Sequence, residues 1–407
     1  DATEAVRPNI IWIMADDLGY GELGCYGQTE IRTPNIDRLA SEGMRFTECY
    51  AGSTVCAPTR CCLMTGRHTG RATVRGNSAR TPDGPFLVPL RDEDVTVAEV
   101  LREAGYATGV TGKWGLGESG TTGTPNRQGF EQWLGFLNQR HAHGYYPEFI
   151  WGNDRMLELT GNLGGGQREW VHDRFTQFGL DFIQQNRERP FFLYMAYTIP
   201  HGRYEVPDDQ PYSNRPWPQH VRNHAAMITR MDADVGRILD CLQESKIDGQ
   251  TIVFFTSDNG AEIYYYRQTN EVEDYVRILK PGGPLRGFKR DLTEGGIRVP
   301  AIARWPGRIP AGTVSDVPWA FWDFLPTAAE LAGAKQPEDI DGRSIVPTLL
   351  GNSQASPEFF YWEFFERGFQ QAARRGPWKA IRNGPTEPIE LYDLAKDIGE
   401  ARNVASQ

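Results

Sequence analysis

The sequence contains few cysteines, an excess of negative charge and no long hydrophobic run. The longest apolar runs, 10–14 and 191–197, are much shorter than the roughly 20 residues of a membrane span, so we expect no membrane insertion. The 6 cysteines lack the spacing of a zinc ribbon or of a dense disulfide framework. The formal net charge of −10 argues against nucleic acid as a partner, because its binders depend on clustered positive charge.

The chain is long enough to bury a large core without disulfide support. At about 150 residues per domain, its 407 residues suggest two or three domains. Aromatic residues make up 12% and charged residues 24% of the sequence, which is typical of a folded protein rather than a disordered one.

Four short apolar stretches are each followed by a polar cluster, a pattern that indicates buried parallel strands. The stretches are 10–14, 106–110, 191–197 and 251–255, and the clusters are 16–17, 111–114, 198–201 and 256–260. Helical periodicity lies between them, most clearly at Ile228, Met231, Val235, Ile238 and Leu242. This alternation predicts an α/β fold, with a large mixed, mostly parallel sheet sandwiched by helices. Because ligands bind beyond the carboxyl ends of such strands, we expect the four clusters to converge on one site.

The pattern changes near residue 351. Short strands are expected at 359–365, 378–382 and 389–392, separated by Gly and Pro turns. We therefore divide the chain into an α/β catalytic domain, 1–352, and a small antiparallel β subdomain, 353–407, that borders the active site.

Two pairs of oxygen-bearing residues follow two of the expected strands. Asp16-Asp17 and Asp258-Asn259 offer the hard ligands that Ca²⁺ and Mg²⁺ prefer. No His or Cys accompanies either pair, which argues against zinc. Asp and Asn are also common in turns, so one pair alone would be unremarkable, but two pairs favour a metal site.

A longer motif begins at Cys56. The run C-A-P-T-R at 56–60, followed by T-G-R at 65–67, resembles the signature of the type I sulfatases. Further motifs match that family in order along nearly the whole chain: P-N at 8–9, D-D at 16–17, T-P-N-I-D at 33–37, G-K-W at 112–114, P-H at 200–201, S-D-N-G at 257–260, Lys289 with E-G-G at 294–296, and E-L-Y-D-L at 390–394. The resemblance implies the alkaline-phosphatase-like fold and a sulfatase, a hydrolase of sulfate esters.

The resemblance also implies the nucleophile and the metal. Cys56 would be converted to formylglycine by a formylglycine-generating enzyme. In the hydrated aldehyde, one hydroxyl attacks sulfur and the other later expels sulfate, which is covalent catalysis with a built-in release step. Residue 56 would complete a metal shell with Asp16, Asp17, Asp258 and Asn259, and the family points to Ca²⁺, with Mg²⁺ as the alternative.

Four more matched residues receive roles in the same way. Arg60 is expected to orient and stabilise the nucleophile, in the first turn of a helix that begins near Pro58. Lys113 and Lys289 are expected to contact the sulfate and offset its charge. His201 is expected to protonate or contact the leaving oxygen.

One position departs from the family. Type I sulfatases usually read G-K-W-H-L-G, whereas this chain has Gly115 in place of that His. The family His is expected to help deprotonate the nucleophile, so its role must move, vanish or pass to another residue. His141 and His143 are the nearest histidines, and an extended segment would put both on one side. The alternatives for this pair are to replace the lost His, to line the sugar pocket, or to have a purely structural role, and the lack of a third ligand argues against a metal site.

The substrate is less directly indicated. We expect His141, His143, Tyr145 and Arg374 to bind a sulfated saccharide, with galactose or N-acetylgalactosamine units of a polysaccharide as the first choice. A phosphate or phosphonate ester hydrolase of the same superfamily, or a non-catalytic sulfated-glycan-binding relative, are the alternatives. Because enzymes that degrade such polymers work outside the cytoplasm, we expect a periplasmic or secreted protein whose signal segment is not part of this chain.

Overall fold

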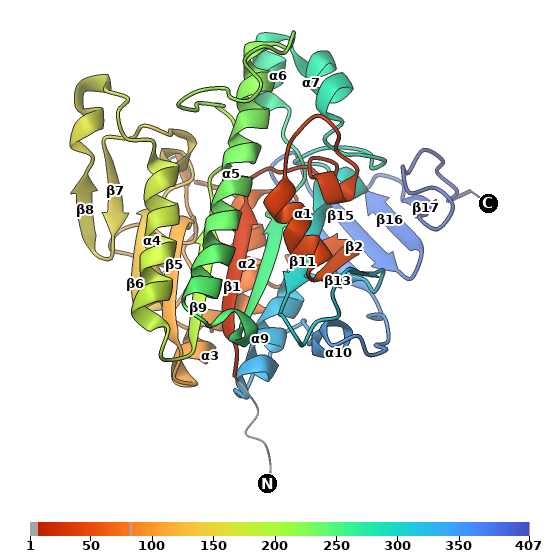
Figure 1. The fold of residues 1–407 in the computed structure, drawn as a ribbon. Coiled ribbons are helices and arrows are strands. Elements are labelled where there is room, and N and C mark those ends of the chain that lie inside the picture. The colour runs from red at the N-terminus through yellow and green to blue at the C-terminus, as the bar shows by residue number, and fades with distance from the viewer. Residues whose placement is uncertain (1–6, 82–83, 407) are drawn as a thin grey trace.

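The chain is built around one large mixed sheet (Figure 1). The computed structural model describes residues 7–81 and 84–406. Neighbouring strands in the large sheet are, in order, β12 (Thr313–Ser315), β2 (Met44–Tyr50), β11 (Arg298–Arg304), β10 (Thr251–Ser257), β1 (Asn9–Ala15), β9 (Phe191–Ala196), β5 (Ala107–Lys113), β6 (Gln132–Phe136), β7 (Phe149–Gly152) and β8 (Arg155–Glu158). Strand β13 (Trp319–Ala320) also pairs with β2, and β3 (Ala79–Thr81) with β4 (Gly84–Phe86) form a separate hairpin.

The centre of the sheet is parallel, as the sequence predicts. Strands β10, β1, β9, β5 and β6 pair in parallel, whereas β11, β7 and β8 join through antiparallel pairs. The strands predicted at 10–14, 106–110, 191–197 and 251–255 correspond to β1, β5, β9 and β10. Strand β5 continues to Lys113, because pairing with β6 extends through Thr111, Gly112 and Lys113. Lys113 is therefore the last residue of a buried strand rather than part of the following loop.

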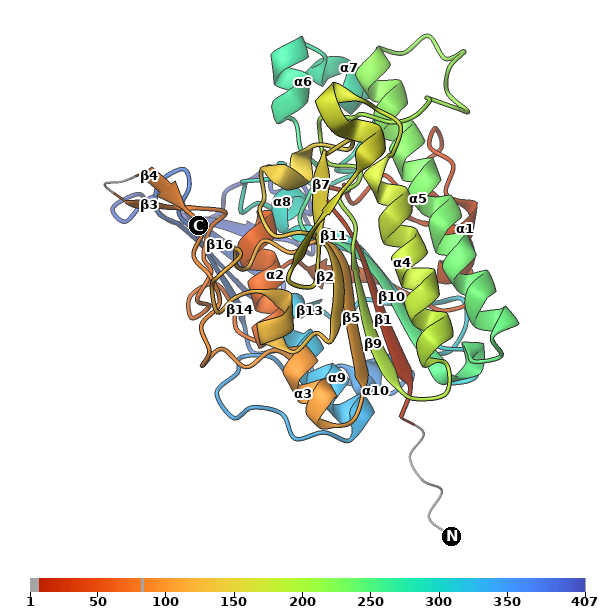
Figure 2. The same cartoon turned by 90° about the vertical axis from the view of Figure 1, so that its left-hand side faces the viewer.

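Helices cover both faces of the sheet (Figure 2). They are α1 (Pro34–Ser41), α2 (Cys56–Thr65), α3 (Val97–Glu103), α4 (Val171–Asn186), α5 (Gln219–Glu244), α6 (Tyr264–Thr269), α7 (Val272–Leu279), α8 (Glu294–Ile297), α9 (Phe324–Ala332) and α10 (Val346–Leu349). Short 3₁₀ turns occur at Gly24–Tyr26, Pro125–Gln128, His141–His143, Thr160–Gly165, Asp248–Gln250 and Phe321–Asp323. Among the described residues, no helix combines the length and the apolar character that crossing a bilayer requires.

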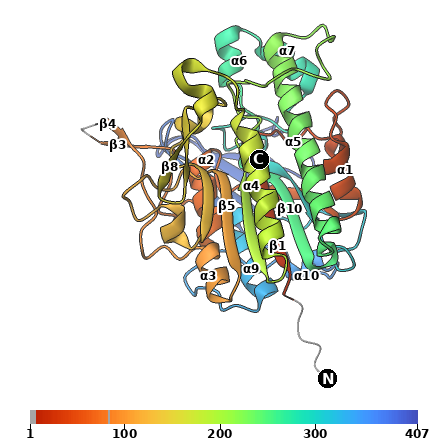
Figure 3. The same cartoon turned by 60° about the vertical axis from the view of Figure 1, so that its left-hand side comes forward.

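The side-chain alternation of β1 shows why the sheet needs two helical layers. Ile10, Trp12 and Met14 point into one hydrophobic core, with apolar residues of α2, α3 and α9. Ile11 and Ile13 point into the other core, which contains the apolar faces of α4 and α5. Figure 3 shows α4 and α5 lying across that face. A strand that is apolar at every position must be covered on both sides, so the α/β prediction is confirmed.

A second sheet lies beside the β2 side of the large one (Figure 1). It contains β14 (Phe360–Phe364), β15 (Gln370–Arg375), β16 (Trp378–Arg382) and β17 (Glu390–Asp393), all antiparallel. The sequence predicts three of these strands and misses β15, whose run Q-Q-A-A-R-R is too polar to show a strand pattern. The division of the chain at 352/353 stays a prediction.

Buried charges join this small sheet to the rest of the protein. The Lys379 ammonium on β16 lies 2.8 Å from Glu294 and 2.9 Å from Glu400, and all three side chains are fully buried. Arg374 on β15 pairs with Glu48 of β2 at 2.6 Å. Because an unpaired buried charge is costly, these pairs fix how the sheet docks.

We expect Lys379→Ala to lower the free energy of unfolding by about 3–5 kcal/mol, because it removes the cation that two buried carboxylates share and leaves Glu294 paired with Arg298, 3.1 Å away. Urea unfolding followed by tryptophan fluorescence measures this change. The matched control is Lys396→Ala, since Lys396 is 84% exposed and pairs with Asp393 at the surface. Equal unfolding midpoints for the two variants would show that the buried network does not anchor the small sheet.

Candidate active site

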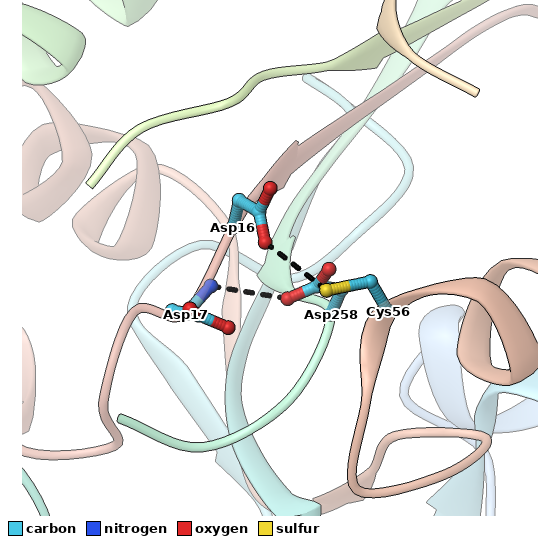
Figure 4. A group of neighbouring side chains, drawn as sticks. All are labelled: Asp16, Asp17, Cys56 and Asp258. Atoms are coloured by element: carbon cyan, nitrogen blue, oxygen red, sulfur yellow. Dashed lines mark hydrogen bonds between the residues drawn. The ribbon is translucent and has the colours of Figure 1, made fainter. Parts of the chain in front are cut away.

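The carboxyl ends of β1 and β10 bring the two predicted metal-binding pairs together. The strands pair in register up to Ala15 and Ser257, so Asp16 and Asp258 come next on adjacent strands. Ligand atoms of Asp16, Asp17, Asp258 and Cys56 all lie within 4.8 Å of one another (Figure 4).

The backbone at Asp17 is held in an unusual conformation. Its φ of 67° lies in the left-handed region, which costs non-glycine residues roughly 1–2 kcal/mol. Local hydrogen bonds stabilise it: the Asp17 N–H donates to Asp258 Oδ1 at 3.1 Å, and the Leu18 N–H donates to Ser257 Oγ at 2.9 Å. This turn directs the Asp17 carboxylate toward Asn259, whose Nδ2 donates to Asp17 Oδ1 at 2.7 Å.

Cys56 is the first residue of α2, two residues earlier than the predicted helix start. Its sulfur lies 3.5 Å from Asp16 Oδ1, 3.2 Å from Lys113 Nζ and 3.5 Å from Lys289 Nζ. Burial, together with Asp16, raises the pKa of the Cys56 thiol to about 12. An unmodified thiol here would stay protonated at neutral pH and would be a weak nucleophile.

Arg60 lies one helical turn beyond Cys56 and is completely buried. Its guanidinium donates to Asp258 Oδ2 at 2.9 Å and to the Lys113 carbonyl at 2.5 Å. It therefore connects the helix that carries Cys56 with the ends of β10 and β5. The long Arg60 side chain therefore ends among buried groups of the site rather than in solvent.

Three buried cations face three buried carboxylates around the sulfur. Lys113 Nζ lies 2.6 Å from Asp16 Oδ2, Lys289 Nζ lies 2.7 Å from Asp17 Oδ1, and Arg60 pairs with Asp258. Burial alone would raise the pKa of Asp16, but Lys113 and the other cations outweigh it and hold that pKa below its usual range. The site is therefore strongly charged in both signs, yet its formal charges balance.

Asp258 behaves differently from Asp16. Burial and the neighbouring Asp16 carboxylate raise its pKa to about 7, although Arg60 opposes the shift. Two carboxylates this close repel each other, so the site favours an additional cation that would neutralise both.

His201 lies at the edge of the carboxylate cluster. Its Nε2 is 3.4 Å from Asp17 Oδ2, and its Nδ1 faces the Gly202 carbonyl. The His143 ring stacks on it, with centroids 4.4 Å apart and an interplanar angle of 23°. Burial and Lys289 lower the pKa of His201 below its usual range, and burial and His201 lower the pKa of His143 to about 2. Both rings are neutral at physiological pH.

A pocket of about 470 Å³ opens above Lys289, His201 and His143. Its other lining residues are Asn77, Glu262, Ile263, Tyr264, Tyr265, Arg267, Arg290 and Arg367. The sequence analysis did not identify these other lining residues, because the tertiary structure brings them together from distant parts of the chain. Arg290 is the one that a sequence motif could have indicated, since it directly follows the matched Lys289.

The structure does not bring Tyr145 and Arg374 to the pocket. Tyr145 is fully buried, and its hydroxyl lies within hydrogen-bond distance of the carbonyls of Thr198 and His201, to one of which it donates. Arg374 bonds to Tyr50 and Glu48, where it docks the C-terminal sheet. Both residues support the architecture and are not placed to touch a saccharide, so their assignment to substrate binding is wrong.

The expectation for His141 and His143 is only half met. The segment is a 3₁₀ turn, His141–His143, rather than an extended strand, so the two rings point to different places. His143 lines the pocket, whereas His141 packs against Phe136 and Phe149 with centroids 4.7 and 4.4 Å away. The assignment of His141 to substrate binding is therefore wrong as well.

At Gly115, the space for a side chain is already filled. The residue has φ +76°, and a Cβ built there would lie 1.9 Å from Gln139 Nε2. The Gln139 side chain is buried, and its amide atoms have no hydrogen-bond partner among the described residues. The His that the family resemblance implies at this position is therefore replaced in space by Gln139.

Comparison with known proteins gives a consistent result. A family model described as Sulfatase matches residues 8–334, and one described as the C-terminal region of N-sulphoglucosamine sulphohydrolase matches residues 287–407. N-acetylgalactosamine-6-sulfatase of Sus scrofa is 36% identical over 428 residues, covering 98% of this chain and 76% of that protein. Arylsulfatase A of Homo sapiens is 35% identical over 445 residues, covering 98% of this chain and 83% of that protein.

The fold is similar to that of solved structures. The crystal structure of Ps i-CgsB in complex with k-i-k-neocarrahexaose has a TM-score of 0.83 and 28% sequence identity to this chain. The similarity covers 98% of this chain and 89% of that one, so it includes both sheets.

We expect Gly115→Ala to destabilise the protein more than Gly120→Ala does. Both glycines have positive φ, so alanine strains the backbone by roughly 1–2 kcal/mol at either position. Only at Gly115 does the added Cβ also collide with Gln139, whereas Gly120 has nothing within 4 Å. Thermal unfolding of both variants measures the difference.

Adding Gln139→Ala to each variant separates the collision from the strain. The second substitution should restore part of the lost stability for Gly115→Ala and none for Gly120→Ala. Equal effects in the two backgrounds would mean that Gln139 does not fill the space beside Gly115.

Proposed function

The chain belongs to the sulfatase family and is a sulfuric ester hydrolase, and on this premise we propose that it removes sulfate from a carbohydrate through residue 56. The supporting observation is the environment of Cys56, a buried sulfur with two lysine ammonium groups and a carboxylate within 3.5 Å. Sulfated galactose or N-acetylgalactosamine units of a polysaccharide are the preferred substrates. A relative named N-acetylgalactosamine-6-sulfatase supports this choice.

Because the pKa of the Cys56 thiol is raised, the unmodified residue would be a weak nucleophile, and we propose that a formylglycine-generating enzyme converts it to formylglycine. Formylglycine hydrate at this position would supply one hydroxyl that attacks sulfur and another that expels sulfate. Arg60 contributes by holding the start of α2 against β10, which fixes the direction in which residue 56 points. Buried and immobile groups of this kind need no reorganisation during the reaction.

The residues at the ends of β1 and β10 fit a divalent cation. Asp16, Asp17 and Asp258 offer carboxylate oxygens, and the buried Asn259 Oδ1 has no hydrogen-bond partner among the described residues. An all-oxygen donor set suits Ca²⁺, with Mg²⁺ as the second choice. When bound, the cation would offset the charge of the sulfate oxygens and of residue 56.

Lys113, Lys289 and His201 are placed to contact different parts of a sulfate ester, the lysines its sulfate oxygens and the histidine its leaving sugar oxygen. Lys113 and Lys289 lie beside the Cys56 sulfur, so we assign them to the sulfate oxygens. His201 holds its Nδ1 against the Gly202 carbonyl, and its Nε2 lies 3.4 Å from Asp17 Oδ2. We assign His201 to contact with the leaving oxygen of the sugar. Because the ring is neutral with its proton on Nδ1, a proton given to that oxygen must first be taken up on Nε2.

The C-terminal unit, 353–407, contributes to the same site in this proposal. Arg367, between β14 and β15, lines the same pocket as Lys289, whose Nζ lies 3.5 Å from the Cys56 sulfur. We also propose that the enzyme acts in the periplasm or after secretion, where polymeric sulfated glycans are accessible.

We expect Cys56→Ala to lower the rate of sulfate release at least about a thousandfold, because the substitution removes the nucleophile. The assay is ion chromatography of free sulfate from regioisomers of mono-sulfated galactose and N-acetylgalactosamine, supplied with Ca²⁺. Mass spectrometry first verifies formylglycine at position 56 in the parent protein. The control, Cys241→Ala, removes a thiol on α5 and should keep full activity. Undiminished sulfate release by Cys56→Ala would refute the proposal.

We expect Ca²⁺ to raise the Tm of chelator-treated protein, because it relieves repulsion among the buried carboxylates. At 100 times its Kd, a ligand stabilises the folded state by about 2.7 kcal/mol. Asp258→Asn should lose most of the shift, and the control Asp240→Asn, at an exposed surface position, should retain it. Differential scanning calorimetry with Ca²⁺ and Mg²⁺ in turn ranks the two ions. Equal shifts in both variants would place the cation elsewhere.

A further inference from the structure

Three arginines surround the outer part of the active-site pocket. This cationic rim consists of Arg267 on α6, Arg290 beside Lys289 in the chain, and Arg367 between β14 and β15. Arg267 is exposed, and the side chains of Arg290 and Arg367 are 30% and 47% exposed. The rim is therefore open to an anion that arrives from solvent.

The rim gives the pocket a charge opposite to that of the whole protein. The pocket lining includes four cationic side chains, those of Lys289 and the rim, and one carboxylate, that of Glu262. The chain as a whole carries a formal net charge of −10. Cationic side chains that line a pocket attract anionic ligands to that pocket, even in a protein whose net charge is negative.

Glu262 does not cancel this charge. Its carboxylate accepts the backbone N–H groups of Tyr264 and Tyr265 at the start of α6. The Glu262 side chain is buried and both of its oxygens are engaged by these backbone donors, and burial raises its pKa above its usual value. The adjacent Tyr265 ring lies edge-on to His201, with centroids 6.2 Å apart, and adds an apolar surface for a sugar.

The carboxylates next to the rim leave its guanidinium groups available. Arg290 Nε is 3.3 Å from Glu366 Oε2, and Arg367 is 3.3 Å from Asp291 Oδ1. Partly exposed pairs of this kind contribute little net stability, because solvent screens the charges. An anionic group of a ligand can therefore form charge-assisted hydrogen bonds with the rim.

The rim arginines are not among the groups that contact residue 56. The lysines that contact the Cys56 sulfur are Lys113 and Lys289, both within 3.5 Å, and no such contact to a rim arginine occurs in the described part of the chain. We assign the reacting sulfate to these two lysines, which leaves the rim for another group of the substrate. A group that meets Arg267 and Arg367 must be carried on another part of the same substrate.

We infer that the cationic rim binds a second anionic group, a sulfate ester or a uronate carboxylate, on the sugar next to the one that loses its sulfate. The inference rests on the proposed function and defines its substrate as an acidic oligosaccharide rather than an isolated sulfated sugar. Arginine suits this role because its planar guanidinium can bind either anion through two parallel hydrogen bonds.

A second hollow beside the rim provides room for a chain of sugars. It has a volume of about 710 Å³ and is lined in part by Arg75, Phe365 and Glu366. Glu366 connects the two hollows, because it accepts the N–H of Asn77 at 2.8 Å, and Asn77 lines the active-site pocket. The Arg75 guanidinium lies 4.6 Å from the Phe365 ring centroid, a flat surface on which a further sugar can rest.

The test compares three disaccharides that share one 6-sulfated N-acetylgalactosamine. The neighbouring sugar is neutral galactose, glucuronate or 4-sulfated galactose. The readout is the ratio of kcat/KM on each acidic disaccharide to kcat/KM on the neutral one. We expect the parent enzyme to prefer at least one acidic neighbour, and the double variant Arg267→Gln/Arg367→Gln to lower that ratio about tenfold, mainly through KM.

Two controls keep the result interpretable. Arg308→Gln removes an exposed arginine that lies over Trp305, outside the pocket, and should leave the ratio unchanged. Calorimetric binding of the same disaccharides to Cys56→Ala protein reports affinity without turnover. The two rim substitutions are also introduced into Cys56→Ala protein, and the affinity of each acidic disaccharide is measured again. The disaccharide whose affinity falls more carries the anion that the rim prefers.

The outcomes separate this inference from the proposed function. Turnover with the same ratio in parent and double variant would overturn the rim inference while leaving the sulfatase activity intact. No turnover of any disaccharide, combined with tighter binding of an acidic one that depends on the rim, would refute the proposed substrate and support the rim. Equal binding of all three disaccharides would overturn the inference whatever the turnover.

Discussion

The site depends on three carboxylates buried at the ends of two adjacent strands. Asp16, Asp17 and Asp258 cannot remain ionised together without compensating charge, because burial removes the water that would otherwise solvate them. The compensation comes from Arg60, Lys113 and Lys289. These cations come from α2, from the end of β5 and from the segment before α8, so one electrostatic requirement draws distant parts of the chain to one point.

The balance of charge in this cluster suits the binding of a divalent cation together with a sulfate ester anion. With carboxylates and cations equal in number, a divalent cation creates a positive excess that a sulfate ester anion can offset. The groups are buried and held by hydrogen bonds, so their fields act in a medium of low polarity and need no rearrangement. Burial, with Asp16 adding to it, raises the pKa of the Cys56 thiol to about 12, although Lys113 and Lys289 oppose the shift, so an unmodified thiol stays protonated at neutral pH.

Sequence motifs predict the inner part of the site and fail at its outer part. Asp16, Asp258, Cys56 and Lys113 lie at fixed offsets from buried strands or a helix start, so local pattern carries their position. Tyr145 and Arg374 lie on segments where charge or aromatic character alone suggested binding, and long-range packing directs them elsewhere. The same physical idea, an arginine cluster for a second anion, applies to Arg267, Arg290 and Arg367 instead.

By itself, the sequence predicted the four central strands of the large sheet, the two oxygen-rich pairs and the residue that we propose as the nucleophile. These features repeat on the scale of a few residues, through hydrophobic periodicity and short motifs. Only the tertiary structure decided which arginines face the pocket, which histidine stacks on His201, and that Gln139 fills the space beside Gly115. The positions of these side chains depend on contacts between residues far apart in the chain. Each position results from the packing of several surrounding segments, which no short stretch of sequence contains.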